Sequence, residues 1–407
     1  MKKNKSKYIC WILTPIIFLT LITMNKVNNI PTTLFIREGQ KFQDSYLVKL
    51  TEKLDIKPTI TTTNTYNRKI NVSILGLVPI KSVSIKTVSS QIMVYPGGQP
   101  IGVKLNTKGV LVVALSDVET ENGKINSPAV ISGIQIGDSI LKIGNSIINS
   151  SENLAKEINL LQGKEILVTI DRKGSEFIKK ILPIKNITDD SYKIGLWVRD
   201  STAGVGTLTF YDANSEKFAA LGHPITDVDT GTILSINSGE IVSSSIVSIK
   251  RGVRGNPGEL KGIFVNEELN IGNIFKNTEC GIFGKANCSL INNTYNKPIK
   301  IALRTEIKEG PAKILTTIDG NEPKLYDIEI QKLLSQDIPG PKSMIIKITD
   351  PILLEKTGGI VQGMSGSPII QDNKLVGAVT HVLINKPDLG YGIYIEWMLQ
   401  DADILSK

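Results

Sequence analysis

The chain has 407 residues, of which 41% are hydrophobic and 21% charged, a composition typical of globular proteins and unlike that of disordered chains. The formal net charge is +8, but four of the basic residues are lysines within the first seven positions. Because the other basic residues form no block and do not alternate with aromatic ones, the composition argues against nucleic-acid binding. Abundant Ile, Val, Thr and Gly favour short strands joined by tight turns, and hence a mainly β fold in more than one domain.

The N-terminal segment predicts a membrane anchor. Residues 8–24 (YICWILTPIIFLTLITM) follow the lysines without a single charge, and 17 residues are just enough to span a bilayer. No small-residue cleavage motif comes after them, so we interpret residues 1–24 as a cytoplasmic basic stub and an uncleaved transmembrane signal anchor. The rest of the chain is then expected outside the cytoplasm, because basic flanks stay on the cytoplasmic side. A cleaved signal peptide is the alternative.

Residues 25–94 are expected to form a linker and a β-rich N-terminal region. Thr, Val and Ile alternate with polar residues between positions 58 and 90, which is the period of strands. The turn-forming stretch YPGGQP, at residues 95–100, then indicates a domain boundary.

The next unit, residues 95–187, combines short strands with one helix. A buried strand follows Lys108-Gly109, glycine turns come after it, and a helix is expected with Ser151 as its N-cap. Within this unit, GIQIGDSILKIGNSII resembles the core of PDZ domains, and the helix follows where that family has it. We therefore predict a PDZ domain here. A small structural β-domain with an unused groove is the alternative.

The PDZ resemblance also implies a peptide groove. PDZ domains bind an extended peptide between a strand and this helix by strand addition. We expect the strand after Lys108-Gly109 to provide the free edge and the helix to provide one wall of the groove.

Residues 188–407 contain repeated short strand patterns separated by turns, which favour a β-sandwich or a pair of β-barrels. The clearest helix is expected at residues 350–359. Asp350 is its predicted N-cap, Pro351 occupies the first turn, and Gly358 ends the helix.

Cysteine and histidine usage predicts no metal site. Cys280 and Cys288 could form a disulfide or remain two free thiols, and the sequence leaves both open. The two histidines of the chain lie far apart in sequence without an acidic cluster, so we expect neither a metal ion nor another cofactor.

A serine between two glycines, in the stretch GMSGS, is the strongest candidate for catalysis. The glycines let the chain turn sharply around Ser365, so that the backbone N–H groups of Gly363 and Ser365 could form an oxyanion hole. A general base active near neutral pH is most easily a histidine. His223 lies in a Gly-His-Pro turn at a strand end, from which its side chain can project into a cleft. It is therefore the predicted base.

Two further features follow the candidate nucleophile. The next strand would place Val379, Thr380 and His381 beside the substrate backbone, although His381 could instead serve only in packing. Ser367 is a rival nucleophile two residues on, but Pro368 follows it, so we expect it to support the turn.

The residues alone leave the acid that orients the histidine open. In the order His-Asp-Ser that chymotrypsin-like peptidases use, this acid lies between His223 and Ser365. Asp350 has a sufficient structural explanation as a helix cap, and the two acids just after His223 are expected to shape their own loop. The candidates are Asp227, Asp229, Asp327, Asp337 and Asp350.

Three longer stretches carry a closer resemblance. LTFYDANSEKFAALGHPITDVDTG, ITDPILLEKTGGIVQGMSGSPIIQDNKLVGAVTHV and GYGIYIEWM resemble the stage IV sporulation protein B family of serine peptidases. That family joins an N-terminal membrane anchor, a PDZ domain and a chymotrypsin-like double β-barrel, an order that this chain matches over essentially its whole length. The resemblance implies that Ser365 is the nucleophile, His223 the base and Asp350 the acid.

The resemblance also implies a biological setting. Members cleave themselves between the anchor and the PDZ domain, and then cut a membrane-associated regulator in the space between the forespore and mother-cell membranes. This cut lets an intramembrane protease activate a late mother-cell sigma factor. The implied partners of this chain are a peptide or protein substrate, its own N-terminal segment and the membrane.

Two other functions remain as alternatives. A stress-type extracytoplasmic protease also combines a chymotrypsin-like domain with a PDZ domain, but it places the protease first. An inactive PDZ scaffold would not need the serine, histidine and aspartate that this chain retains.

Overall fold

The computed structural model describes residues 32–38, 56–60, 67–74, 78–336 and 338–405, together with Thr14. Apart from Thr14, the predicted anchor lies outside the described residues. Within the described part, no helix is both long and apolar enough to cross a membrane. The fold is mainly β, as predicted, and three separate clusters of buried hydrophobic residues hold it together.

A small sheet stands at the N-terminal side. Its strands follow the order β1-β4-β3-β2, and β1 runs parallel to β4. Phe35 in β1 and Val88 in β4 are buried in the largest core cluster, and the Arg37 guanidinium pairs with the Glu306 carboxylate at 2.7 Å. These contacts attach the sheet to the rest of the chain. The strands are β1 (Thr33–Arg37), β2 (Ile56–Ile60), β3 (Asn67–Ile74) and β4 (Val78–Val88).

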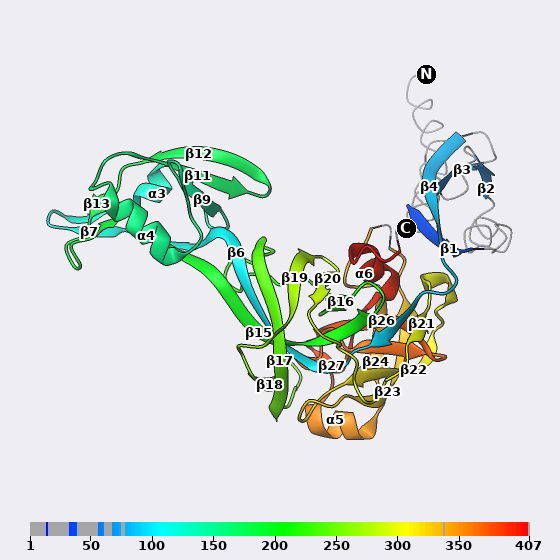
Figure 1. Cartoon of the computed structure of the whole chain (residues 1–407). Helices are drawn as coiled ribbons and strands as arrows, with labels where there is room; N and C mark the ends of the chain where they lie inside the picture. Colours follow the sequence, from blue (N-terminus) through cyan, green and yellow to red (C-terminus); the bar gives the residue numbers. More distant parts are fainter. Residues whose placement is uncertain are drawn as a thin grey trace, which may run out of the picture.

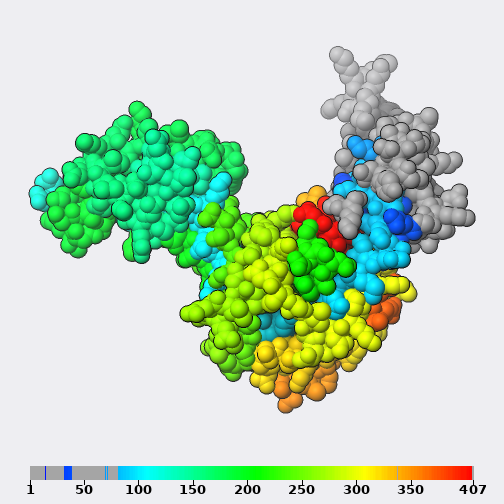
Figure 2. All heavy atoms as spheres, viewed as in Figure 1, coloured from blue at the N-terminus to red at the C-terminus, as the bar shows by residue number. Residues whose placement is uncertain are grey.

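The unit predicted as a PDZ domain projects from the remaining molecule (Figures 1 and 2). Leu154 and Ile158, on one face of α4, are buried with Val110 and Val168 from the strands, so this face of the helix packs against the core. Its elements are β7 (Val118–Thr120), β8 (Gly123–Ile125), α3 (Pro128–Ile131), β9 (Ser139–Ile143), β10 (Ser146–Ile147), α4 (Ser151–Leu160), β11 (Ile166–Arg172), β12 (Ser175–Ile181), β13 (Ile184–Lys185) and β14 (Tyr192–Lys193).

The N-cap of α4 is one residue earlier than predicted. Ser150 accepts the backbone N–H of Asn153 on its hydroxyl oxygen at 3.1 Å. The Ser151 hydroxyl donates instead to the carboxylate of Asp200 at 2.9 Å, and so does its backbone N–H at 2.8 Å. Serine is a favourable N-cap residue at either position. Because Ser151 bonds to Asp200 in the folded chain, Ser150 is the residue that caps α4.

The predicted free edge of the PDZ-like unit is not where we placed it. The strand after Lys108-Gly109 belongs to β6 (Pro100–Leu115), which pairs antiparallel with Leu196–Arg199 of β15 (Leu196–Asp212). Its other edge begins a pairing with β9 at Val110. The prediction was wrong because β15, a strand from later in the chain, lies beside β6 and contacts α4.

Strands β6 and β15 continue from the PDZ-like unit into a barrel (Figure 1). Residues 101–107 of β6 pair with β17, so this part of the predicted 95–187 unit lies in the barrel. Ile101, Val103 and Leu105 are buried there in a common cluster with Phe218. The other strands are β16 (Lys217–Ala220), β17 (Ile236–Lys250), β18 (Glu259–Phe264), β19 (Asn270–Thr278) and β20 (Gly281–Ala286).

The last part of the chain builds a second group of strands around the largest core cluster. The helix predicted at 350–359 is present as α5, with Asp350 as N-cap and Gly358 in a left-handed conformation at φ 74°. The elements are β5 (Met93–Pro96), β21 (Ile299–Ile301), η2 (Arg304–Glu306), β22 (Gly310–Thr316), β23 (Lys324–Leu333), β24 (Met344–Ile348), α5 (Pro351–Thr357), β25 (Pro368–Gln371), β26 (Lys374–Leu383), β27 (Lys386–Tyr394) and α6 (Ile395–Asp401).

The two cysteines in the described part are not bonded to each other. Cys280 is a buried free thiol and Cys288 an exposed one. Of the two alternatives left open by the sequence, the structure shows free thiols.

Candidate active site

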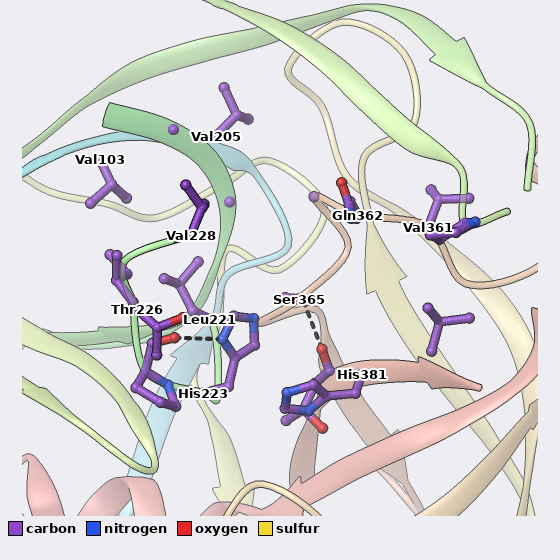
Figure 3. Close-up of a pocket in the computed structure, with 18 of the residues that line it drawn as sticks. Val103, Val205, Leu221, His223, Thr226, Val228, Val361, Gln362, Ser365 and His381 are labelled. Carbon is purple, nitrogen blue, oxygen red and sulfur yellow. Dashed lines mark hydrogen bonds between the residues drawn. The ribbon is translucent and has the colours of Figure 1, made fainter. Parts of the chain in front are cut away.

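A cavity of about 560 Å³ brings the predicted nucleophile and base together (Figure 3). Ser365, His223 and His381 all line it, although the first two are separated by more than a hundred residues in sequence. Its other walls are mainly apolar. They include Val103, Val205, Leu221, Val228, Val361 and Ile384.

The loop around Ser365 follows the turn that its glycines predict. Gly363 and Gly366 have φ values of 95° and 97°, in the region that favours glycine. A Cβ on Gly366 would also lie 2.2 Å from the carbonyl oxygen of Thr207, so no larger residue fits there. The Ser365 hydroxyl donates to the carbonyl oxygen of Thr380 at 2.7 Å. In this structure the Ser365 hydroxyl is therefore hydrogen-bonded to β26 and not to the histidine.

Two threonines of β15 fix this loop. The Thr207 hydroxyl donates to the carbonyl of Gly363 at 2.7 Å, and the Thr209 hydroxyl donates to that of Gly366 at 2.8 Å. The backbone N–H of Thr207 also donates to the carbonyl of Ser365 at 3.2 Å. Sequence reasoning missed these residues, although buried threonines at alternate positions of an apolar strand are a usable signal.

The predicted oxyanion donors are available. Gly363 and Ser365 both line the cavity, and their backbone N–H groups donate no hydrogen bond to any residue in the described part of the chain. Because an oxyanion hole needs unoccupied, preorganised donors, this state fits the predicted role. The role itself stays a prediction.

His223 is presented by a sharp turn after β16. Leu221 and Gly222 have φ values of 70° and 71°, which turns the chain toward the cavity. The Nδ1 atom of His223 lies 2.8 Å from the carbonyl oxygen of Pro224. Since a carbonyl can only accept, Nδ1 carries the hydrogen and Nε2 is left as an acceptor, which a general base requires. Burial lowers the pKa of His223, so its imidazole is neutral near pH 7.

His381 lies against His223. The ring centroids are 5.0 Å apart with the planes inclined by 45° (Figure 3). Burial, with smaller effects of His223 and Lys342, lowers the pKa of His381 to about 4. Its Nδ1 atom is buried and has no hydrogen-bond partner among the described residues. His381 is thus a neutral wall of the cavity beside the predicted base.

The residues of the predicted substrate-binding strand have two different roles: Val379 supports the serine loop, and Thr380 and His381 line the cavity. The Val379 N–H donates to the carbonyl of Ser367 at 2.9 Å, and the Val379 carbonyl accepts from Gly366 at 2.8 Å, so its backbone holds the serine loop. Thr380 and His381 line the cavity, where a substrate strand could reach them. The rival Ser367 is fully buried, and its hydroxyl donates to Thr316 at 2.8 Å.

The structure does not bring Asp350 to His223. One carboxylate oxygen of Asp350 accepts the N–H groups of Ile352 and Leu353, each at 3.0 Å, and the other accepts that of Asp327 at 3.3 Å. Among the described residues that line the cavity, Asp350 is not found. Its carboxylate therefore caps α5 and also bonds to the backbone of β23.

The other candidate acids are engaged as well. Asp227 is buried and forms an ion pair with Arg199, which also binds Asp229 at 2.8 Å. Asp327 pairs with Lys313 at 2.5 Å. The last candidate, Asp337, lies outside the described residues.

Comparison with known proteins identifies the family. The family model described as SpoIVB peptidase S55 matches residues 190–399, which is just over half of the chain. This chain belongs to the SpoIVB peptidase S55 family. It is therefore a serine peptidase, as the sequence predicted.

Solved structures with similarity to this peptidase fall into two groups. The PDZ domain of the SdrC-like protein from Listeria monocytogenes is 18% identical, with a TM-score of 0.18, and the match covers 22% of this chain and 87% of that one. The active form of the Rv3671c protease from M. tuberculosis is 11% identical over 50% of this chain and 75% of that one, with a TM-score of 0.30. Its inactive form is 12% identical over 50% and 85%, with a TM-score of 0.29.

Because Asp350 caps α5, its replacement by alanine should destabilise this peptidase more than its replacement by asparagine. Asp350→Ala should lower the free energy of unfolding by about 1 kcal/mol, because two N–H groups at the start of α5 lose their acceptor. Asp350→Asn should change it by a few tenths of that, since asparagine caps helices about as well. Urea unfolding of the three proteins measures the difference. Equal stability of the alanine variant and the wild type would contradict the role.

Proposed function

We propose that this peptidase is a membrane-tethered endopeptidase of sporulation signalling, which first cleaves itself and then a membrane-associated regulator. The observation that carries the proposal is that Ser365 and His223, the family's nucleophile and base, open into one cavity within a chain of this family. The regulator's cleavage would release an intramembrane protease to activate a late mother-cell sigma factor. The chain would act outside the cytoplasm, in the space between the forespore and mother-cell membranes.

The reaction that we propose is acyl transfer on a chymotrypsin-like double β-barrel, with a predicted anchor at residues 1–24. The Ser365 oxygen attacks the carbonyl carbon of the scissile peptide bond while Nε2 of His223 takes its proton. The N–H groups of Gly363 and Ser365 stabilise the oxyanion. His223 then gives the proton to the leaving amine, and water hydrolyses the acyl-enzyme.

Substrate binding would also prepare the nucleophile. The Ser365 hydroxyl is bonded to the Thr380 carbonyl, so it must turn before His223 can take its proton. A substrate strand laid along β26 would offer a backbone N–H to the same carbonyl. The serine would thereby lose its acceptor and turn toward the imidazole. The apolar cavity walls suit an apolar side chain on the substrate.

A cleavage assay between two copies tests the proposal. The full-length Ser365→Ala chain, tagged at its C-terminus, is placed in liposomes with or without untagged wild type, and its products are followed by mass spectrometry. We expect the tagged chain to lose its N-terminal segment only when the wild type is present. The cut should fall between residue 24 and the PDZ-like unit.

The same assay distinguishes other outcomes. A tagged chain that stays whole beside an active wild type would argue against cleavage of its own N-terminal segment between copies. Cleavage without the wild type would show a contaminating protease. A wild-type chain that cleaves neither itself nor casein would support the scaffold alternative.

A further inference from the structure

The serine loop leaves two of its backbone N–H groups free while its other backbone groups are bonded. Five peptide units join Gln362 to Ser367. All five carbonyls accept a hydrogen bond, and three of the N–H groups donate one. The other two, those of Gly363 and Ser365, donate to no residue in the described part of the chain. The bonds of the rest of the loop therefore determine where these two groups point.

The peptide unit between the two free N–H groups is held by a side chain. It joins Gly363 to Met364, and its C=O accepts the hydroxyl of Thr207 at 2.7 Å. Its N–H donates to the carbonyl of Val361 at 3.1 Å. Because a peptide unit is planar, it turns about ψ of the residue before it and φ of the residue after it. A turn of this unit would therefore displace both neighbouring units, which carry the free N–H groups.

The backbone of Gly363 does not hold this unit by its own conformational preference. Its φ of 95° lies in a region that glycine occupies readily, but glycine also occupies most other regions at little cost. The bond from the Thr207 hydroxyl is therefore the contact that restricts the Gly363 carbonyl to one direction.

Thr207 is itself held in place by bonds that do not involve its side chain. It is 2% exposed, its N–H donates to the carbonyl of Ser365 at 3.2 Å, and its carbonyl accepts the N–H of Leu221 at 3.3 Å. These backbone bonds can persist when the hydroxyl is removed. Thr207 is not among the described residues that line the cavity, so its hydroxyl acts on a substrate only through Gly363.

We propose that Thr207 is a positioning residue of this peptidase, whose hydroxyl keeps the N–H groups of Gly363 and Ser365 directed at the developing oxyanion. Donors that are already oriented stabilise the oxyanion because they need not reorganise as its charge develops. The proposal rests on the proposed roles of Ser365 as nucleophile and of the two N–H groups as oxyanion hole. It is independent of the sporulation substrate.

Thr209 provides a matched comparison on the same strand. It is fully buried, and its hydroxyl donates to the carbonyl of Gly366 at 2.8 Å. That carbonyl belongs to the unit that joins Gly366 to Ser367, which is adjacent to neither unit with a free N–H group. Thr209→Val thus removes an equivalent hydrogen bond at a different place in the loop.

The first test measures the reactivity of the serine. Full-length proteins in mild detergent are labelled with a rhodamine fluorophosphonate, a probe that reacts with activated serines, and the second-order rates are compared. Thr207→Val should label about 10- to 100-fold more slowly than the wild type, which is less than the loss of a whole oxyanion donor costs. Thr207→Ser keeps the hydroxyl and should recover most of the rate. A Thr207→Val protein that labels as fast as Thr209→Val would overturn the proposal.

The second test reports on the oxyanion hole directly. Ser365 displaces fluoride from diisopropyl fluorophosphate, and the phosphoryl oxygen of the resulting phosphate triester takes the place of the oxyanion. We expect the ³¹P resonance of the Thr207→Val adduct to move toward that of the urea-unfolded adduct, and the Thr207→Ser adduct to keep the wild-type shift. Because both valine variants should lose similar stability in urea, a general loss of structure would move the Thr209→Val resonance equally. Equal movement would overturn the proposal.

Two further variants complete the design. Thr207→Ala removes the same hydroxyl within a smaller side chain, so it should label as slowly as Thr207→Val, and a wild-type rate would overturn the proposal. Ser365→Ala should not label. Equal labelling of Ser365→Ala and the wild type would overturn the proposed reaction and the role of Thr207 with it, whereas fast labelling of both hydroxyl-free Thr207 variants would overturn the role of Thr207 alone.

Discussion

Ser365→Ala should lower kcat by about 10⁴- to 10⁶-fold on any protein substrate, because the oxygen that forms the acyl-enzyme is gone. The cavity and the oxyanion donors remain, so binding should change little and the loss should appear in kcat. The structure also predicts an unchanged fold, since the Ser365 hydroxyl forms its hydrogen bond with one carbonyl at the cavity wall. Hydrolysis of a quenched fluorescent casein by the full-length protein measures the effect.

Ser367→Ala is the matched control for this result. Ser367 lies two residues away on the same loop, but its hydroxyl is buried against Thr316 and outside the cavity lining. We expect this variant to be less stable and still active. If it were inactive while Ser365→Ala kept its activity, the nucleophile would be Ser367.

His223→Ala should reduce kcat by a similar factor, and the double variant with Ser365→Ala should be no worse than either single one. Residues that act together in one step lose their combined effect when either is removed. Additive losses would show that the two residues act in separate steps. Casein hydrolysis by the three variants distinguishes these cases.

The pH dependence of the wild type provides an independent check on His223. A general base must be neutral, and burial lowers the pKa of His223 below its ordinary value of 6.5. The neutral form therefore persists to lower pH, and kcat/KM should fall only as the pH drops below that value. If kcat/KM already began to fall at a pH above 6.5 on acidification, a negative charge would lie close to the imidazole and raise its pKa.

Much of the site could be predicted because it depends on local chemistry. The glycines around Ser365 determine a turn that few other residues allow, and histidine is so rare in this chain that His223 stands out. The start of α5 is equally local, since Asp-Pro followed by a short apolar helix specifies both the cap and the first turn.

The contacts of the supporting residues could not be predicted, because their partners lie far away in sequence. Thr207 contacts Gly363 across more than 150 positions, and Asn277 contacts Ile225 across 52. Sequence periodicity shows which face of a strand is buried, but it does not show which strand becomes its neighbour. Asp350 illustrates a second limit, since a capping aspartate and a catalytic one have the same sequence signature.

The course of β6 and β15 determines how this protein can be divided. The chain enters the barrel along residues 101–107 of β6 and returns to it along β15, so the PDZ-like unit is an insertion between two barrel strands. A chain shortened to begin at residue 188 would keep Ser365 and His223 but would lack Ile101, Val103 and Leu105 of the barrel core. We therefore expect a shorter, stable peptidase when a short turn replaces the insertion, and not when the chain is cut at residue 188.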